Sequence, residues 1–301
     1  MGLFSTASKE SQIGVDFLRD GIAIAQVKAS GEKPRDLLRA EFIEAIGQEA
    51  QVEALRQWVR SHGLQKAPCV CLIASDDCDV YQVEKVAVED AEMLQAMTWK
   101  IKDLISYDVA NAVVDTYPMP ASSITNQQQV GVVAAHETVI ASYVDSIKTS
   151  TMRLQALDIH DLVPANLPAV RASAGQSLVL MSFSNDTGML NVYHDTDLYV
   201  SREFKIGISR LERAGGDDES ALDALLLEIQ RSLDYFESFY GMAAVTDLRI
   251  FPRVEATERL ALYLQNLTNY DIDFLNLGEH DAVVDPSCFH AYCAALRDLN
   301  S

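Results

Sequence analysis

Two similar hairpin signals constrain this chain more than any other feature of its sequence. In the first, apolar residues alternate along 13–17, a turn follows at Arg19-Asp20-Gly21, and a second apolar strand runs through 22–27. The second places strands at 178–183 and 189–193 around Asn185-Asp186-Thr187-Gly188. Such alternation around a polar turn predicts antiparallel strand pairs. Two hairpin-led halves of similar size predict a duplicated architecture.

Helical and strand patterns alternate through the rest of the chain. Apolar residues at helical spacing predict helices over 49–62, 90–107, 138–148, 220–240, 258–267 and 286–299. Short apolar runs predict strands over 68–75, 112–116, 130–135, 154–159, 248–251 and 272–277. This order indicates an α/β protein, in which 112–159 form a small β-β-α-β insert.

The net charge excludes several classes of partner. The chain has 44 acidic and 24 basic side chains, for a formal charge of −20. A nucleic-acid backbone or an anionic membrane is repelled by such a surface, whereas basic partners are attracted. The longest apolar runs have strand length, and the five cysteines are irregularly spaced. We therefore expect a cytoplasmic protein with no nucleic-acid partner.

The motifs of common enzyme classes are missing. The sequence has no phosphate-binding loop, no dinucleotide glycine fingerprint and no Gly-x-Ser-x-Gly elbow. His136-Glu137 begins like a zinc-protease helix, but Ile140 stands where the second ligand is needed. We therefore predict no catalytic residues.

Metal ligands are not predicted either. Cys69 and Cys71 lie two apart on an apolar strand, a pattern more typical of buried thiols than of a zinc knuckle. Four further histidines show no spacing that predicts a shared site: His160, His194, His280 and His290.

The opening Ile13-Gly14-Val15-Asp16, the matching second hairpin and the insert together resemble the actin-like superfamily. Four stretches are similar to pilus-assembly proteins of the PilM type, in particular those that serve mannose-sensitive haemagglutinin (MSHA) pili. They are Asp20-Gly21-Ile22-Ala23-Ile24-Ala25, Trp99-Lys100-Ile101-Lys102-Asp103-Leu104-Ile105, Gln155-Ala156-Leu157-Asp158-Ile159 and Gln230-Arg231-Ser232-Leu233-Asp234-Tyr235-Phe236-Glu237-Ser238.

The resemblance implies a two-domain actin-like fold, which is a duplicated RNase H-like fold, with the inserted subdomain typical of FtsA and PilM relatives. The first domain would cover 1–159, including the insert at about 91–157, and the second would cover 160–301.

The resemblance also implies a scaffold at the cytoplasmic face of the bacterial inner membrane. A PilM-type protein binds the N-terminal cytoplasmic tail of a PilN-type inner-membrane protein and so connects it to other proteins of the pilus assembly platform. The groove for this tail would lie near Trp99, Lys102, Asp103 and Tyr107. Such tails are often basic, which suits an acidic adaptor.

The nucleotide site that the resemblance implies looks degenerate. Actin-like proteins hold phosphates in two glycine-bearing hairpins, because a residue without Cβ lets backbone N–H groups approach closely. Asp16 matches the first acidic position, but Leu18, Arg19 and Asp20 stand where the family has Gly followed by Ser or Thr. In the second hairpin, Met181 and Phe183 correspond to the expected Asp and Gly.

We therefore expect a pseudo-ATPase without a cofactor. Two alternatives stay open at this point: an active ATP- and Mg²⁺-binding family member, and a sugar kinase of the same superfold.

Overall fold

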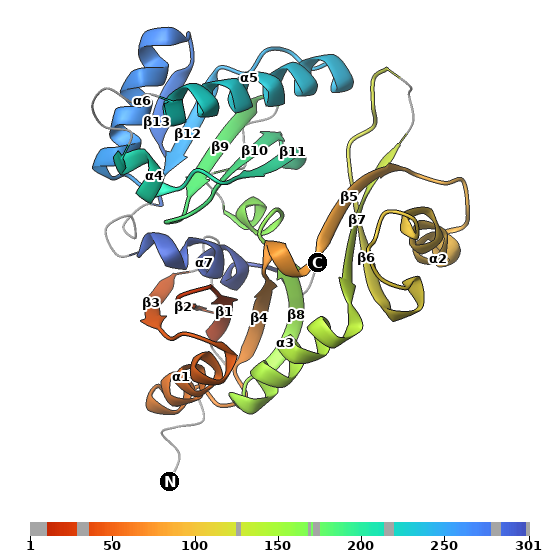
Figure 1. Ribbon diagram of the computed structural model, residues 1–301, viewed down its shortest axis with the longest axis vertical. Helices are drawn as coiled ribbons and strands as arrows, with labels where there is room; N and C mark the ends of the chain where they lie inside the picture. The colour runs from red at the N-terminus through yellow and green to blue at the C-terminus, as the bar shows by residue number, and fades with distance from the viewer. Residues whose placement is uncertain are drawn as a thin grey trace. The chain divides into compact units, whose positions relative to one another are not determined.

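Two five-stranded sheets with the same strand order form the framework of the chain (Figure 1). The computed structural model describes residues 11–28, 36–124, 128–167, 170, 175–213, 220–277 and 284–298. The first sheet has the order β3 (Leu37–Glu44), β2 (Gly21–Lys28), β1 (Ser11–Phe17), β4 (Pro68–Ile73), β8 (Arg153–Ile159). The second has the order β11 (Asp197–Phe204), β10 (Gly188–His194), β9 (Ser177–Phe183), β12 (Asp247–Phe251), β13 (Asp271–Phe274). The predicted duplication is confirmed.

The strand directions also repeat. In each sheet the first three strands along the chain pair antiparallel, and the last two run parallel to the central strand, β1 or β9. Both predicted hairpins form. The sequence patterns did not indicate the edge strands β3 and β11, because their half-exposed faces mix charged and apolar residues.

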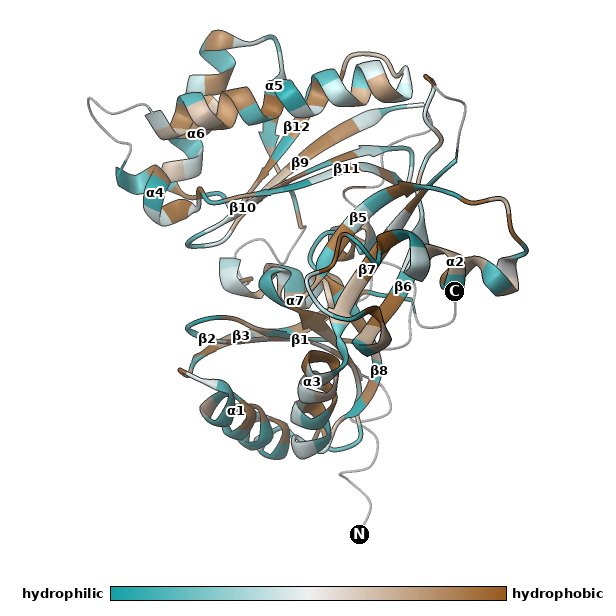
Figure 2. Cartoon of the chain, turned by 45° about the vertical axis from the view of Figure 1, so that its right-hand side comes forward, coloured by the Kyte–Doolittle hydropathy of each residue, from teal (hydrophilic) through white to brown (hydrophobic). Residues whose placement is uncertain are grey.

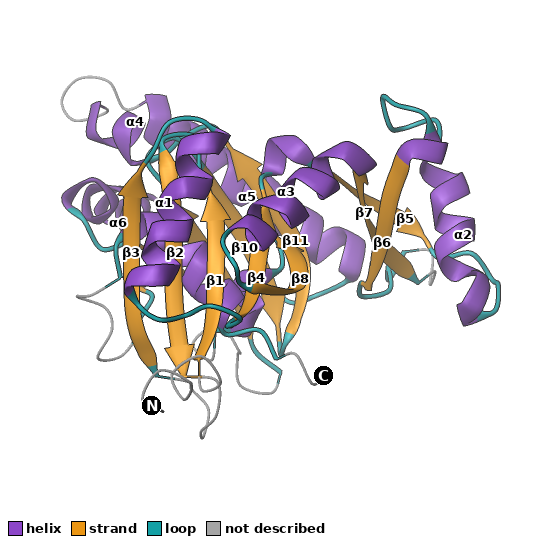
Figure 3. Ribbon diagram, turned by 90° about the horizontal axis from the view of Figure 1, so that it is seen from below, coloured by secondary structure: helices purple, strands orange, loops and turns teal. Residues whose placement is uncertain are grey.

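Helices cover both faces of the first sheet. On one face, α1 (Gln48–Ser61) and α3 (Glu137–Thr149) bury Leu55, Trp58 and Ile147 against the strands (Figure 3). Gly63, at φ +66°, follows His62, the residue that caps the end of α1, as its position in the sequence predicts. On the other face, the C-terminal helix α7 (Phe289–Ala295) contacts β1, β2 and β4. Short 3₁₀ turns lie at Ser75–Asp77, Val163–Asn166 and Pro286–Cys288.

The second sheet has its own core. The helices α5 (Ser220–Tyr240) and α6 (Glu255–Leu267) and the short α4 (Ile208–Arg213) pack their apolar side chains against it. The central strand β9 is hydrophobic along most of its length (Figure 2).

A third, smaller sheet forms the insert. Its order is β5 (Asp79–Glu84), β7 (Gln129–His136), β6 (Ala112–Pro118), and α2 (Asp90–Ile101) covers one face with Met93, Met97 and Ile101. A 3₁₀ turn, Val109–Asn111, leads into β6.

The predicted insert boundaries, about 91–157, are wrong at both ends. The insert begins at β5, because this strand pairs with β7 and not with the first sheet. It ends at β7, because α3 packs into the core of the first sheet and β8 pairs parallel to β4. The observed insert therefore comprises 79–118 and 129–136.

The chain divides into two compact units, and the division differs from the predicted boundary after 159. The first unit comprises the described parts of 1–118, 129–167 and 283–301, and the second those of 119–128 and 168–282. The C-terminal residues belong to the first unit because α7 packs on its sheet. Ser123 belongs to the second because its backbone N–H donates to the carbonyl oxygen of Phe239, at 3.0 Å.

The environment of the thiols gives a test of this fold. Cys69, Cys71, Cys288 and Cys293 are buried, and only Cys78 is partly exposed. Burial raises the pKa of Cys288 to about 12 and that of the other three buried thiols further. Because the thiolate is the reactive form, we expect one rapidly reacting thiol with Ellman's reagent in the native protein and five in denaturant. Cys78→Ser removes the rapid reaction; a second rapid thiol would contradict the packing.

Candidate functional site

The turn of the first hairpin is closed by its own hydrogen bonds. The Leu18 N–H donates to the carbonyl oxygen of Gly21 at 2.9 Å, and the two residues between them are exposed. Gln51 of α1 donates through Nε2 to the carbonyl oxygens of Leu18 (2.6 Å) and Gly21 (3.0 Å). Within this turn, which the structure describes in full, no residue has the left-handed φ of an anion-binding nest.

The second hairpin turn is closed in a different way. The Ser184 N–H donates to the Thr187 carbonyl at 2.9 Å, and the two hydroxyls lie 3.0 Å apart. The Ile208 and Ser209 N–H groups at the start of α4 donate to the carbonyls of Ser184 and Asn185. The N–H groups of Ser184, Ile208 and Ser209 are therefore bonded within the protein.

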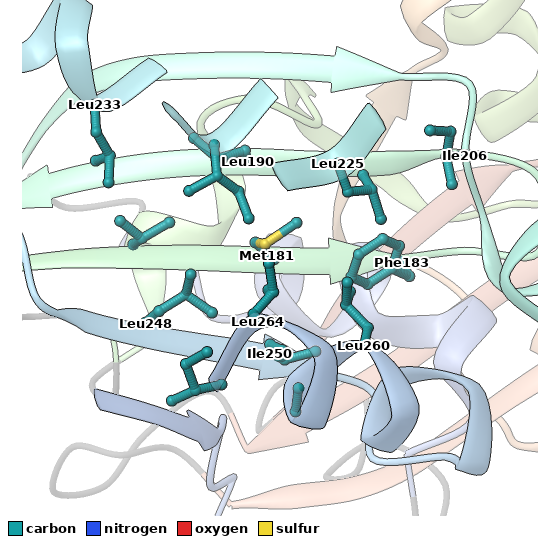
Figure 4. Close-up of a cluster of buried hydrophobic side chains, with 14 of the residues drawn as sticks. Met181, Phe183, Leu190, Ile206, Leu225, Leu233, Leu248, Ile250, Leu260 and Leu264 are labelled. Carbon is teal, nitrogen blue, oxygen red and sulfur yellow. The ribbon is translucent and has the colours of Figure 1, made fainter. Parts of the chain in front are cut away.

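The side chains of Met181 and Phe183 lie in the core and not at a ligand site. They are 0% and 2% exposed and point among the apolar side chains of α5 and α6 (Figure 4). The assignment of Met181 to the acidic position and of Phe183 to the glycine position of a phosphate site is therefore wrong, because both side chains face the core and alternate strand residues face opposite sides. In the first hairpin, Asp16 pairs with Ala23, and this is the second residue pair counted from the turn. The equivalent residue of the second hairpin is Ser182.

Ser182 is thus the counterpart of Asp16. Its hydroxyl is buried, and no described residue is within hydrogen-bonding distance of it. A serine hydroxyl lacks the carboxylate oxygens that Mg²⁺ prefers. At the position equivalent to Asp16, the second hairpin carries Ser182, whereas the sequence resemblance predicts Met181 at this position.

Asp16 is almost completely enclosed. Its side chain is 1% exposed, and its Oδ2 atom lies 2.9 Å from Nε2 of His160, the residue that directly follows β8. On the same face, α7 comes so close to β1 that a Cβ on Gly14 would lie 1.8 Å from the carbonyl oxygen of Ala291. The acidic residue of the first hairpin is therefore covered by the C-terminal helix.

Polar contacts fasten α7 to this face. Arg297 forms an ion pair with Asp158, which lies in one row with Leu72 and Asp16 across β8, β4 and β1. Gln12 Nε2 donates to the Arg297 carbonyl at 2.8 Å. Burial raises the pKa of Asp158, and the Arg297 charge opposes this shift.

A second histidine completes the surroundings of Asp16. The ring of His290, on α7, meets that of His160 edge to face, with 4.8 Å between ring centroids. Burial lowers the pKa of His290 to about 3, so its imidazole is neutral at physiological pH. One ligand-type atom from each of Asp16, His160 and His290 lies within 4.8 Å of the others. We call these three residues the Asp-His-His cluster.

Sequence reasoning missed this cluster. The three residues lie on β1, after β8 and on α7, so no spacing along the chain brings them together. His194 lies in the second unit, and His280 lies outside the described residues.

The expected partner-binding residues divide into two groups. Trp99 is 57% exposed on α2, with the Lys102 ammonium 5.4 Å from its ring centroid, and Asp103 is exposed beside them. Tyr107 instead packs into the insert core, with its ring edge-on to His136 at 5.3 Å. Burial raises the pKa of Tyr107 to about 12. Tyr107 therefore supports the insert, while the other three lie on its surface.

Comparison with solved structures identifies the fold. A PilM-PilN type IV pilus biogenesis complex matches with a TM-score of 0.66 and 16% identity, covering 95% of this chain and 97% of that one. A Bacteroides thetaiotaomicron protein with an actin-like ATPase fold matches at 0.56 and 9%, covering 96% and 98%. No family model matches the sequence, and no curated protein matches it significantly. The chain has the actin-like α/β fold, as predicted.

Gln51 gives a test of the first turn. Gln51→Ala leaves the Leu18 carbonyl without its side-chain donor, and we expect a loss of about 1–3 kcal/mol in the free energy of unfolding. Gln57→Ala is the matched control on the same helix, because Gln57 is exposed and bonds only to Glu53. Urea denaturation measures both. Equal stability of the two variants would contradict a role of Gln51 in closing the turn.

Proposed function

We propose that this chain is an adaptor of a type IV pilus assembly platform, of the kind represented by MshI in MSHA pili. It binds the N-terminal cytoplasmic tail of a PilN-type inner-membrane protein and connects it to other platform proteins. The observation that carries the proposal is the fold likeness to the PilM-PilN complex over nearly the full length of both chains. The four PilM-like sequence stretches support it independently.

The surface of the insert supports a binding role. Three large apolar side chains are exposed on α2 and the turn after it: Leu94 at 46%, Trp99 at 57% and Leu104 at 55%. Tryptophan is enriched among the residues that dominate binding energies at protein interfaces. The insert has its own core of Met93, Met97 and neighbouring residues, and this core holds in place the helix that carries the exposed apolar side chains.

Charge favours the same partner. The chain carries −20, and cytoplasmic segments next to membrane spans are rich in Lys and Arg. Opposite charges accelerate association and help to exclude wrong partners. The described ranges contain no helix that is both long and apolar enough to span a membrane. We propose that the adaptor stays peripheral to the cytoplasmic face of the inner membrane through its partner.

We further propose that the adaptor works without ATP hydrolysis. Three observations support this: Asp16 is 1% exposed and bonded to His160, Ser182 replaces the second acidic residue, and both hairpin turns are closed by internal hydrogen bonds. The retained Asp16 is the observation that favours the alternative of an active ATP-binding protein.

Trp99 gives the test of the binding surface. Trp99→Ala should weaken binding of the partner's N-terminal tail peptide at least about fivefold in calorimetric titration, because an interface tryptophan commonly contributes more than about 1 kcal/mol. Leu262→Ala is the control, since Leu262 is 60% exposed on α6 in the second unit. Failure of the wild-type chain to bind any such tail would overturn the adaptor proposal. Tail binding that survives Trp99→Ala would overturn only the position of the surface.

A nucleotide titration tests the proposed loss of ATP binding. We expect no heat and no shift in unfolding temperature with Mg-ATP. A chain that binds ATP would gain about 2.7 kcal/mol of stability at a hundredfold excess over Kd. Saturable stabilisation that disappears in Asp16→Asn would support the ATP-binding alternative, and turnover with a sugar acceptor would support a kinase.

A further inference from the structure

We propose that the Asp-His-His cluster binds a divalent transition-metal ion, with zinc as the representative metal. The proposal goes beyond the adaptor function and does not depend on it. All three residues belong to the first unit, so the site needs no contribution from the second. The ligand-type atoms of Asp16, His160 and His290 already lie within 4.8 Å of one another.

Two buried polar atoms in the cluster point to a missing ligand. Oδ1 of Asp16 and Nε2 of His290 are buried, and no described residue lies within hydrogen-bonding distance of either. Leaving a buried acceptor unsatisfied is costly, and burying a carboxylate without full compensation costs more. A cation held between these atoms would satisfy both at once.

The donor set indicates which cations fit. Two imidazoles and one carboxylate are typical ligands of zinc and related first-row metals, whereas Mg²⁺ and Ca²⁺ prefer oxygen ligands only. With bonds of about 2.0–2.1 Å, neighbouring ligands of zinc stand roughly 3.3 Å apart. His160 Nε2 and Asp16 Oδ2 are 2.9 Å apart, so the distance between these two atoms is already close to the distance between neighbouring zinc ligands. Binding replaces the hydrogen bond between these atoms and releases any proton held there.

The position of the site assigns a role to the ion. Asp16 is on β1 and His290 is on α7, the helix that packs against β1 at Gly14. A metal bound to both would fasten the C-terminal helix to the central strand. Three protein ligands leave a fourth position for water, an arrangement that a zinc ion accepts.

The test uses the full-length protein after treatment with a chelator. Titration with Zn²⁺ should show one high-affinity site and a raised unfolding temperature, whereas Mg²⁺ at the same concentration should give neither. Co²⁺ should give a visible spectrum without the charge-transfer band of a thiolate ligand, which distinguishes the site from one that uses cysteine.

Ligand variants make the assignment specific. His160→Gln and His290→Gln should each weaken Zn²⁺ binding at least about 100-fold, since even groups that only support a ligand contribute 10- to 100-fold. His194→Gln is the matched control, because His194 lies on β10 in the second unit. Asp16→Asn keeps the size of the side chain and gives a further variant if a histidine variant does not fold.

Two results would overturn the proposal. The first is the absence of saturable Zn²⁺ binding by the wild-type chain. The second is binding that is as tight in His160→Gln, His290→Gln and Asp16→Asn as in the wild type, which would place the ion on exposed carboxylates. Neither result bears on tail binding, so the adaptor proposal is tested separately.

Discussion

The close packing of α7 on β1 determines the surroundings of Asp16 in the first unit. Gly14 permits this contact, because a Cβ there would lie 1.8 Å from the Ala291 carbonyl oxygen. Through it, α7 covers Asp16 and brings His290 next to His160. Asp16 is therefore an interior residue, and its carboxylate is hydrogen-bonded to the His160 ring.

The two units share a topology but differ in what they place at equivalent positions. Asp16 and Ser182 stand at the same step of their hairpins, yet one is a carboxylate bonded to His160 and the other is a hydroxyl with no bonding partner among the described residues. Each hairpin turn is closed by a separate set of internal hydrogen bonds. The two units therefore share their strand order, while the polar residues near the ends of their central strands differ.

The elements that sequence reasoning found are those with strong apolar periodicity, among them both hairpins and the helices α1, α3 and α5. The edge strands β3 and β11 were not predicted, because their partly exposed residues weaken the alternation of apolar and polar side chains. The error at Met181 has a simple physical cause, since a shift of one residue along a strand reverses the face. The Asp-His-His cluster could not be found, because its members are joined only by tertiary packing of α7.

The same packing makes any coordination of Mg²⁺ by Asp16 costly. To coordinate Mg²⁺, Asp16 would have to give up its contact with His160 and become accessible beneath a helix that Arg297 and Gln12 hold in place. The insert carries no such constraint, because Trp99 is exposed and its supporting core is separate. The chain therefore combines an interior that resists a ligand-driven opening with a surface that is free to bind. This division of properties suits an adaptor better than a nucleotide-driven switch.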